Sequence, residues 1–200
     1  METNAIFFEI PNEAPQSGPA NFVVSNPTTG QIFAAATFNM QSASPGLYTT
    51  NGSGTGQVAA AVYDSKGNYT GNNSPSIPTT AGGTITLWLT GAGYVPGLPA
   101  DGTAPNGSFN THATPNVLIN GQPAQVLFSG ISPQFPGLWQ LNVVVPPGTP
   151  SSTISPISVV VTLDDYNSNI GGGPSAPSGA PGPDIPLLVG NGLITTIYVK

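Results

Sequence analysis

The amino-acid sequence predicts an all-β protein whose main body is an immunoglobulin-like β-sandwich. No stretch places apolar residues at the i, i+3, i+4 and i+7 spacing of a helix, whereas alternation of every second residue recurs along the chain. Turn residues separate the alternating runs, and the chain contains 26 glycines and 23 prolines. Short strands with turn chemistry between them are typical of two packed antiparallel sheets.

Residues 1–42 form a predicted strand segment that precedes the sandwich. Ile6, Phe8 and Ile10 alternate, a short apolar stretch follows at residues 22–24, and a longer alternating run covers residues 32–40. The same layout recurs near the C-terminus, at residues 143–146, 159–162 and 193–199. The N-terminal segment therefore resembles the last strands of a preceding immunoglobulin-like copy whose earlier strands are absent.

Residues 43–200 form the predicted sandwich. Asn120-Gly121 predicts a hairpin turn, with Val126 and Phe128 on the returning strand. Two polar or low-complexity stretches, residues 63–83 and the Gly/Pro-rich residues 171–184, are predicted loops. The predicted strands are those of Val58, Ala60 and Val62; Ile85, Leu87 and Leu89; Val117 and Ile119; Val126 and Phe128; Trp139, Leu141, Val143 and Val145; Ile157, Val159, Val161 and Leu163; and Leu193, Thr195, Ile197 and Val199.

Five motifs along this region carry a resemblance to a known family. They are residues 43–48 (ASPGLY), 52–57 (GSGTGQ), 82–91 (GGTITLWLTG), 117–128 (VLINGQPAQVLF) and 136–146 (PGLWQLNVVVP). In order and spacing they resemble the immunoglobulin-like C-terminal domain of secreted, largely uncharacterised acidobacterial proteins. The resemblance implies a sandwich fold and an extracellular or cell-surface setting in a bacterium, and it brings no catalytic residues. The loop at residues 171–184 departs from the short turn of that family.

Charge is scarce. The chain has 2 lysines and no arginine against 8 carboxylates, for a net charge of −6, and charged residues make up 5% of it, where about 25% is usual. Such a surface offers no basic footprint for nucleic acid. No apolar run reaches the roughly 18 residues of a membrane span, and no signal peptide is recognisable in this numbering. Cysteine is absent, which excludes disulfides and thiolate metal sites.

The residue inventory predicts a protein that is not an enzyme and needs no cofactor. The single histidine, His112, lies in a polar stretch with Asp101 as the only acid near it in sequence, whereas a Ser-His-Asp triad needs an orienting carboxylate. Most carboxylates that would serve glycoside cleavage stand beside turn residues, where they commonly cap turns. These carboxylates are Glu9, Glu13, Asp64, Asp101, Asp164, Asp165 and Asp184.

One run offers clustered oxygen ligands. Asp165, Asn167 and Asn169 alternate after the strand at residues 157–163, at a spacing that calcium loops use. The run lacks the glycine and the distant glutamate of an EF-hand loop. A solvated turn that ends the strand is the favoured interpretation, and a calcium site is the alternative.

Several large apolar residues are out of phase with the core-facing residues of their strands. Either these strands are covered on both faces, or the residues form an interface between copies of the chain. The out-of-phase residues are Phe7, Trp88, Ile194 and Tyr198. Together with the alternating apolar face of Ile6, Phe8 and Ile10 they are the expected interface residues.

The sequence therefore predicts a non-enzymatic extracellular structural subunit. Copies would self-assemble into a fibre or surface layer when one of them donates a strand to an open sheet of the next. The alternative is a secreted module for carbohydrate binding or adhesion, with a glycan as partner, because aromatic faces also suit sugar rings.

Overall fold

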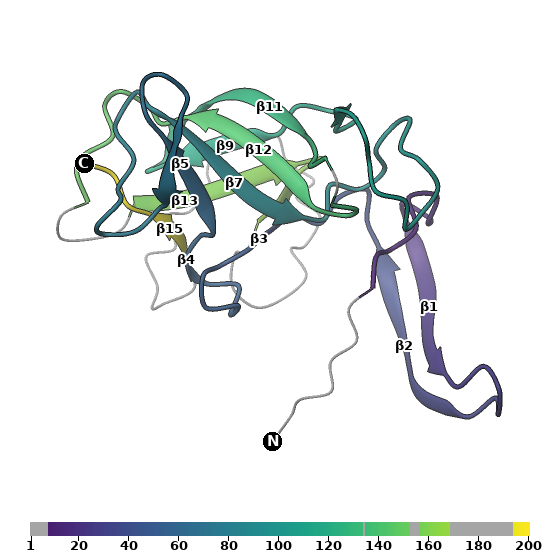
Figure 1. Ribbon diagram of the computed structural model, residues 1–200. Coiled ribbons are helices and arrows are strands. Elements are labelled where there is room, and N and C mark those ends of the chain that lie inside the picture. The colour runs from purple at the N-terminus through teal and green to yellow at the C-terminus, as the bar shows by residue number, and fades with distance from the viewer. Residues whose placement is uncertain (1–7, 134, 153–156, 169–193) are drawn as a thin grey trace.

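A computed structural model describes residues 8–133, 135–152, 157–168 and 194–200 of the chain. Two antiparallel-rich sheets pack as a sandwich, and a separate two-stranded hairpin projects from one end of it (Figure 1). The described residues contain strands, turns and bends but no helix, which confirms the predicted all-β class. They also contain no helix long and apolar enough to cross a membrane.

The larger sheet has the strand order β6-β5-β7-β12-β11-β8, and β3 pairs with the end of β7. Its central pair, β7 and β12, runs antiparallel from Thr84↔Val144 to Leu89↔Trp139. The strands are β3 (Gly46–Leu47), β5 (Ala60–Tyr63), β6 (Tyr69–Asn72), β7 (Thr84–Thr90), β8 (Phe109–Asn110), β11 (Gln125–Ile131) and β12 (Trp139–Val144).

The smaller sheet has the order β10-β9-β13-β15-β4, with β14 beside the end of β13. The last strand, whose pairing the sequence left open, lies antiparallel to β13 and parallel to β4. The strands are β4 (Gly56–Gln57), β9 (Asn116–Ile119), β10 (Gln122–Pro123), β13 (Ile157–Leu163), β14 (Tyr166–Asn167) and β15 (Thr195–Ile197).

The core lies between the two sheets and follows the period-two alternation of the sequence. In β7 and β12 every second side chain is completely buried, and β13 alternates in the same way. The largest fully buried side chains are Trp139, Ile85, Leu87, Leu89, Ile119, Leu141, Leu163, Ile197, Val58, Val95, Val117 and Val143. The N-terminal end of this core is Ala43, which is 1% exposed.

The hairpin turn at residues 120–121 is present, but the strand that returns from it is short. Asn120 and Gly121 both have positive φ, at 52° and 71°, as a type I′ turn requires. After β10 the chain leaves the smaller sheet at Ala124 and enters the larger one as β11, which pairs with β12. Val126 and Phe128 therefore belong to the opposite sheet from the one predicted. Strand alternation does not reveal such a change of sheet, because it is continuous across residue 124.

Two further predictions need correction. The stretch of residues 63–83 was expected to be a loop, yet it contains β6, which pairs with β5 at the edge of the larger sheet. The strand expected around Ile6, Phe8 and Ile10 is not found at residues 8–10, which pair with no strand; residues 1–7 lie outside the described part. The loop at residues 171–184 also lies outside it.

Candidate functional site

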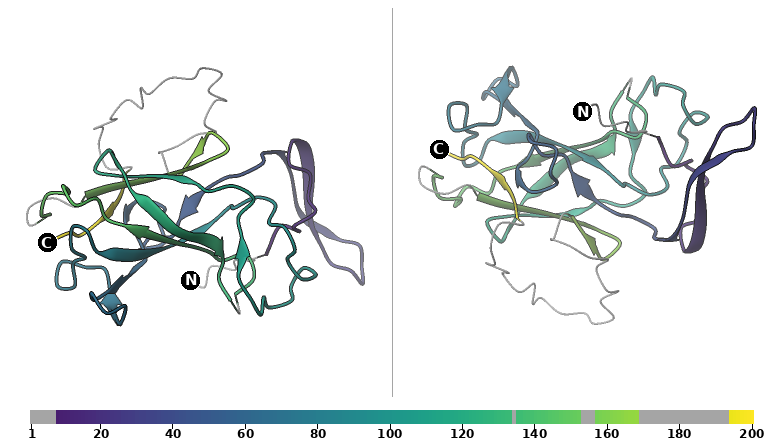
Figure 2. Two further views of the ribbon diagram at one scale, coloured as in Figure 1. Left: turned by 90° about the horizontal axis from the view of Figure 1, so that it is seen from above. Right: turned by 90° about the horizontal axis from the view of Figure 1, so that it is seen from below.

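The projecting hairpin consists of β1 (Gly18–Ser25) and β2 (Ile32–Met40). The two strands pair antiparallel from Gly18↔Met40 to Ser25↔Ile32, with one irregularity that leaves Phe33 without an opposite residue. Neither strand pairs with a strand of the sandwich. Figure 2 shows the hairpin at the end of the molecule remote from the C-terminal strand.

One face of this hairpin is apolar throughout. Phe22 lies opposite Ala36, and Ala20 and Val24 lie opposite Phe38 and Ala34. Because side chains alternate between faces, these six share one side of the two-stranded sheet. The opposite side is mixed: it carries the polar pair Asn21 and Thr37, whose Oγ1 donates to Asn21 Oδ1 at 2.7 Å, next to the apolar pair Val23 and Ala35. The hairpin is therefore amphipathic, although it stands outside the sandwich core.

Three aromatic rings gather on the apolar face. The rings of Phe22 and Phe38 meet edge to face, with centroids 5.3 Å apart, and Phe8 packs on Phe22 at 5.8 Å. Phe8 nevertheless stays 63% exposed and Phe38 55% exposed. Contacts within the chain thus leave most of this aromatic surface in water.

The root of the hairpin is fixed to the sandwich. The side chain of Asn12 donates to Val95 O at 3.1 Å and accepts from Val95 N at 2.9 Å. The backbone N–H of Asn12 donates to Asp101 Oδ1. On the other side, Ser44 N donates to Gly91 O. The projecting strands are therefore held at their base. The described hydrogen bonds of residues 18–40, including those of the turn at Asn26–Gln31, stay within this segment.

Five of the seven expected interface residues lie in the described part of the chain, and they belong to different elements. Phe8 lies on the hairpin's apolar face, and Ile10, 47% exposed, follows it. Trp88 is half-buried on the outer face of the larger sheet, as its phase predicts. Tyr198 is bound to the sandwich, since its backbone exchanges hydrogen bonds with the side chain of Asn73. Ile194, which directly precedes β15, is 37% exposed. Ile6 and Phe7 lie outside the described residues.

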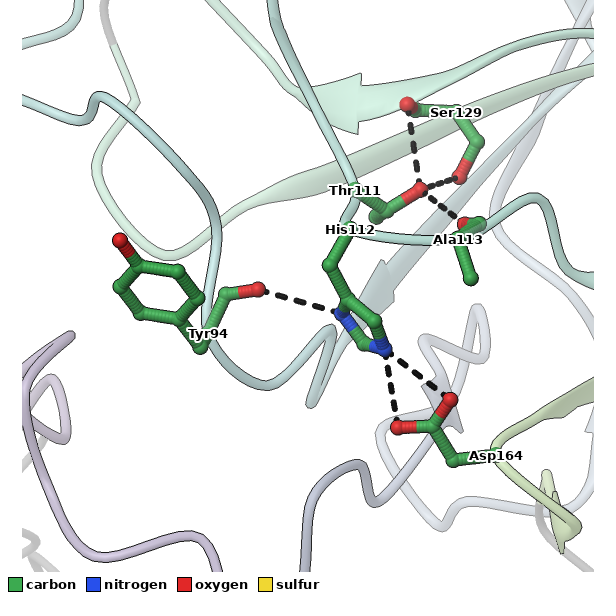
Figure 3. A network of polar contacts seen from close by, with 6 residues as sticks. All are labelled: Tyr94, Thr111, His112, Ala113, Ser129 and Asp164. Carbon is green, nitrogen blue, oxygen red and sulfur yellow. Dashed lines mark hydrogen bonds and ion pairs between the residues drawn. The ribbon is translucent and has the colours of Figure 1, made fainter.

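A polar network centred on His112 lies near the root of the hairpin (Figure 3). His112 Nε2 lies 2.9 and 3.0 Å from the two Asp164 oxygens, and Nδ1 lies 3.2 Å from Tyr94 O. Both neighbours accept hydrogen bonds, so the doubly protonated imidazolium is the form that donates to both. The pair joins the loop before β9 to the turn after β13.

The same network sets the ionisation of Asp164. Desolvation raises the pKa of its carboxyl, but the hydrogen bonds from His112 and from the Ser42 side chain, with the charge of His112, outweigh it and lower the pKa from its ordinary value of 3.8. Ser42 lies just after β2. The ion pair thus links the sandwich to the point at which the hairpin leaves it.

This arrangement differs from a catalytic triad. In a triad one imidazole nitrogen contacts the carboxylate and the other accepts the proton of a nucleophile. Here the second nitrogen faces the Tyr94 carbonyl, and the serine is bonded to the aspartate instead. The geometry is that of a structural ion pair between loops. This contact was not predictable from the sequence, because the two residues are separated by 52 positions.

Two of the expected calcium ligands lie in the hairpin of β13 and β14: Asp165 in its turn and Asn167 in β14. Asp164 and Asp165 both have positive φ, at 49° and 65°, and form the turn itself. Asn167 Oδ1 accepts from Thr162 Oγ1 at 2.5 Å, and Asn169 lies outside the described residues. No cluster of three or more His, Asp or Glu side chains is found in the described part of the chain.

A groove of about 700 Å³ opens on the larger sheet beside the β5–β6 turn. Tyr63, Thr84, Thr86 and Asn142 line it together with the turn at residues 64–67 and the loop at residues 80–83. Asn142 Oδ1 accepts from Thr86 Oγ1 and from Gln140 Nε2, which orients the amide. Its Nδ2 has no acceptor among the described residues. The sequence did not indicate this groove, because its residues come from three separate segments.

Comparison of the chain with protein-family models, with curated proteins and with solved structures finds no match.

Proposed function

We propose that this protein is a non-enzymatic, extracellular structural subunit, copies of which associate through the β1–β2 hairpin. The observation that carries the proposal is the apolar face of that hairpin, on which Phe8, Phe22 and Phe38 cluster. Phe8 and Phe38 are largely exposed, and Phe22 is half-buried between them. The resemblance to secreted immunoglobulin-like domains and the scarcity of charge support the extracellular setting.

Physical stability also favours a partner for the hairpin. A two-stranded hairpin alone is marginally stable in water, and three or more strands or a packed face are needed for independent stability. Burying one Phe side chain contributes roughly 1.5–3 kcal/mol. Covering Phe22 and Phe38 would therefore stabilise an associated state by several kcal/mol before its entropic cost is subtracted.

A second copy is the favoured partner because of the charge distribution. No Asp, Glu, Lys, Arg or His occurs between Glu13 and Asp64, so the entire hairpin is uncharged. Lysines and other charges are the usual protection of exposed strands against pairing. Identical uncharged hairpins repel one another little and present matching apolar faces.

Sedimentation velocity tests the proposal by comparing the wild-type chain with Phe22→Ser/Phe38→Ser. The wild type should associate with rising concentration, and the double variant should stay monomeric. Val23→Ser is the matched control, since Val23 is 55% exposed on the opposite face of the same strand. A wild-type chain that remains monomeric, or a double variant that associates like the wild type, would contradict the proposal.

A second candidate function, binding of a neutral glycan, is supported by the groove beside the β5–β6 turn. Its volume falls within the roughly 300–1,000 Å³ of small-ligand sites. The free Asn142 Nδ2 and the hydroxyls of Tyr63 and Thr84 suit sugar hydroxyls. Asp64 is occupied, because Asn68 Nδ2 and the amides of Asn68 and Lys66 donate to it, which lowers its pKa.

Titration of the protein with neutral oligosaccharides, followed by NMR, tests this candidate. Amide shifts confined to the groove, and lost in Asn142→Ala, would support it. Asn110→Ala, a change at an exposed residue of β8, is the control. Unchanged spectra across a panel of neutral oligosaccharides would argue against glycan binding.

A further inference from the structure

We infer that association occurs by antiparallel pairing of β2 with β2 of a second copy, which joins two hairpins into one four-stranded sheet. The inference rests on the proposed self-association and adds a backbone contact to it: the joined sheet places the apolar faces of the two hairpins next to one another on the same side. Its starting point is the outer edge of β2, whose backbone groups pair with no described strand. A bare strand edge is a template for another strand.

Strand length argues for pairing between hairpins. β2 has nine residues, whereas the strands at the ends of the sandwich sheets are short: β6 has four residues, and β8, β10 and β4 have two each. A nine-residue strand added to any of these would leave most of its backbone groups without a protein partner. Among the described strands outside the sandwich, only the hairpin strands themselves match its length.

Edge chemistry favours β2 over β1. β1 begins Gly18-Pro19, and a proline has no N–H to donate to a neighbouring strand. β2 contains neither proline nor charge, and its register with β1 is regular from Ala34 to Met40. Pairing of β2 with itself is isologous, so it closes into a two-fold dimer, whereas pairing of β2 with β1 of the next copy would continue as a filament.

The two-fold axis should pass near Thr37, the middle of the regular run from Ala34 to Met40. Only the residue at the axis lies directly opposite its own counterpart in the second copy. Each step away from the axis moves the two copies of a residue apart by twice the rise of about 3.4 Å per residue. A position two residues from the axis is thus separated from its counterpart by about 14 Å along the strands, beyond the reach of a disulfide.

Single-cysteine variants test this geometry directly, since the chain contains no cysteine. Cysteine is placed in turn at each position from Ala34 to Met40 of the full chain, and mild oxidation is followed by non-reducing electrophoresis. The disulfide-linked dimer should peak at one or two positions among Ala36, Thr37 and Phe38, and should be lost at Ala34 and Met40. Ser108→Cys, on an exposed loop of the sandwich, should give no linked dimer.

Sedimentation of the same samples separates the two possible failures. Association without a central peak, or with equal cross-linking along the whole strand, would overturn β2–β2 pairing and leave the proposed self-association in place. A wild-type chain that sediments as a monomer at all concentrations would overturn both.

Discussion

Ser129 holds a buried hydrogen-bond network in the core of the larger sheet. Its Oγ accepts from Nε1 of the fully buried Trp139 at 2.9 Å. It also lies 2.7 Å from Thr111 Oγ1, which in turn donates to Ala113 O (Figure 3). Trp139 is the first residue of β12, and Thr111 follows β8. One hydroxyl therefore fixes the largest core side chain and the edge of the same sheet.

Ser129→Ala should lower the free energy of unfolding by about 1–3 kcal/mol, because it leaves the Trp139 N–H buried without an acceptor. Urea unfolding followed by tryptophan fluorescence measures the change. Ser108→Ala, at an exposed site, should alter stability by no more than about 0.5 kcal/mol. Equal stability of the Ser129 variant and the wild type would show that the network contributes little.

Asp164 predicts a pH dependence of stability. Its folded pKa is lowered below its unfolded value, so its contribution to stability is complete above the unfolded pKa of about 4 and is lost as the pH falls through the folded pKa. Asp164→Asn should therefore be less stable than the wild type at pH 5–6, and this difference should shrink as the pH falls below about 4. Thermal unfolding across this range measures it.

Asp165→Asn is the matched control for that experiment. Asp165 occupies the same turn with positive φ, a conformation that asparagine also tolerates, and it makes no described side-chain hydrogen bond. A difference between wild type and Asp164→Asn that is constant from pH 3 to pH 6 would contradict the role assigned to the carboxylate.

At the scale of elements, the segment of residues 42–44, which follows the hairpin, passes in close backbone contact with the glycines just after β7. A Cβ on Gly91 would lie 1.8 Å from Ser44 O, and one on Gly93 would lie 1.8 Å from Ser42 O. Both glycines also have positive φ. The absence of side chains at these two positions allows residues 42–44 to approach, and it sets the direction in which the hairpin leaves the sandwich.

Gly91→Ala should destabilise the sandwich severely, because the new methyl group collides with backbone that has no room to move. Gly102→Ala separates this steric effect from backbone strain. Gly102 has nearly the same φ, +74° against +76°, but nothing lies within 4 Å of its Cβ position. It should cost only the roughly 1–2 kcal/mol of the left-handed conformation. Chemical denaturation measures both variants, and equal losses would mean that the close approach is relieved by a small shift.

At the scale of the whole molecule, the sandwich and the hairpin differ in what stabilises them. The sandwich encloses its own core, whereas the hairpin has one apolar face that the described residues leave open. Among the described residues, the hydrogen bonds that join the two parts lie at the root of the hairpin. Stability of the sandwich should therefore be independent of the projecting strands.

Replacing residues 18–40 by a short Gly-Ser link tests this independence. Gly18 and Met40 are opposite one another, so a short link spans the gap without strain. The unfolding midpoint of the sandwich at low protein concentration should stay the same, while self-association is lost. A large drop in the midpoint would mean that the hairpin contributes to the folding of the sandwich itself.

Much of the fold could be predicted from single residues and their spacing. The alternation at residues 85–89, 139–145 and 157–163 predicted core strands that the structure confirms, because burial on one face requires that period. The Asn120-Gly121 turn was also predictable from local sequence, because Asn and Gly tolerate the two positive φ angles that the turn requires. The immunoglobulin-like assignment within this all-β class stays a prediction.

Tertiary structure alone decided which strands share a sheet and which polar residues meet. The change of sheet at Ala124, the edge strand β6 and the contact of His112 with Asp164 depend on neighbours distant in sequence, which no local pattern encodes. The hairpin illustrates both levels. The apolar stretch at residues 22–24 and the alternation at residues 32–40 predicted strands, but only the three-dimensional arrangement paired them and left their apolar face outside the core, because the sandwich closes without it.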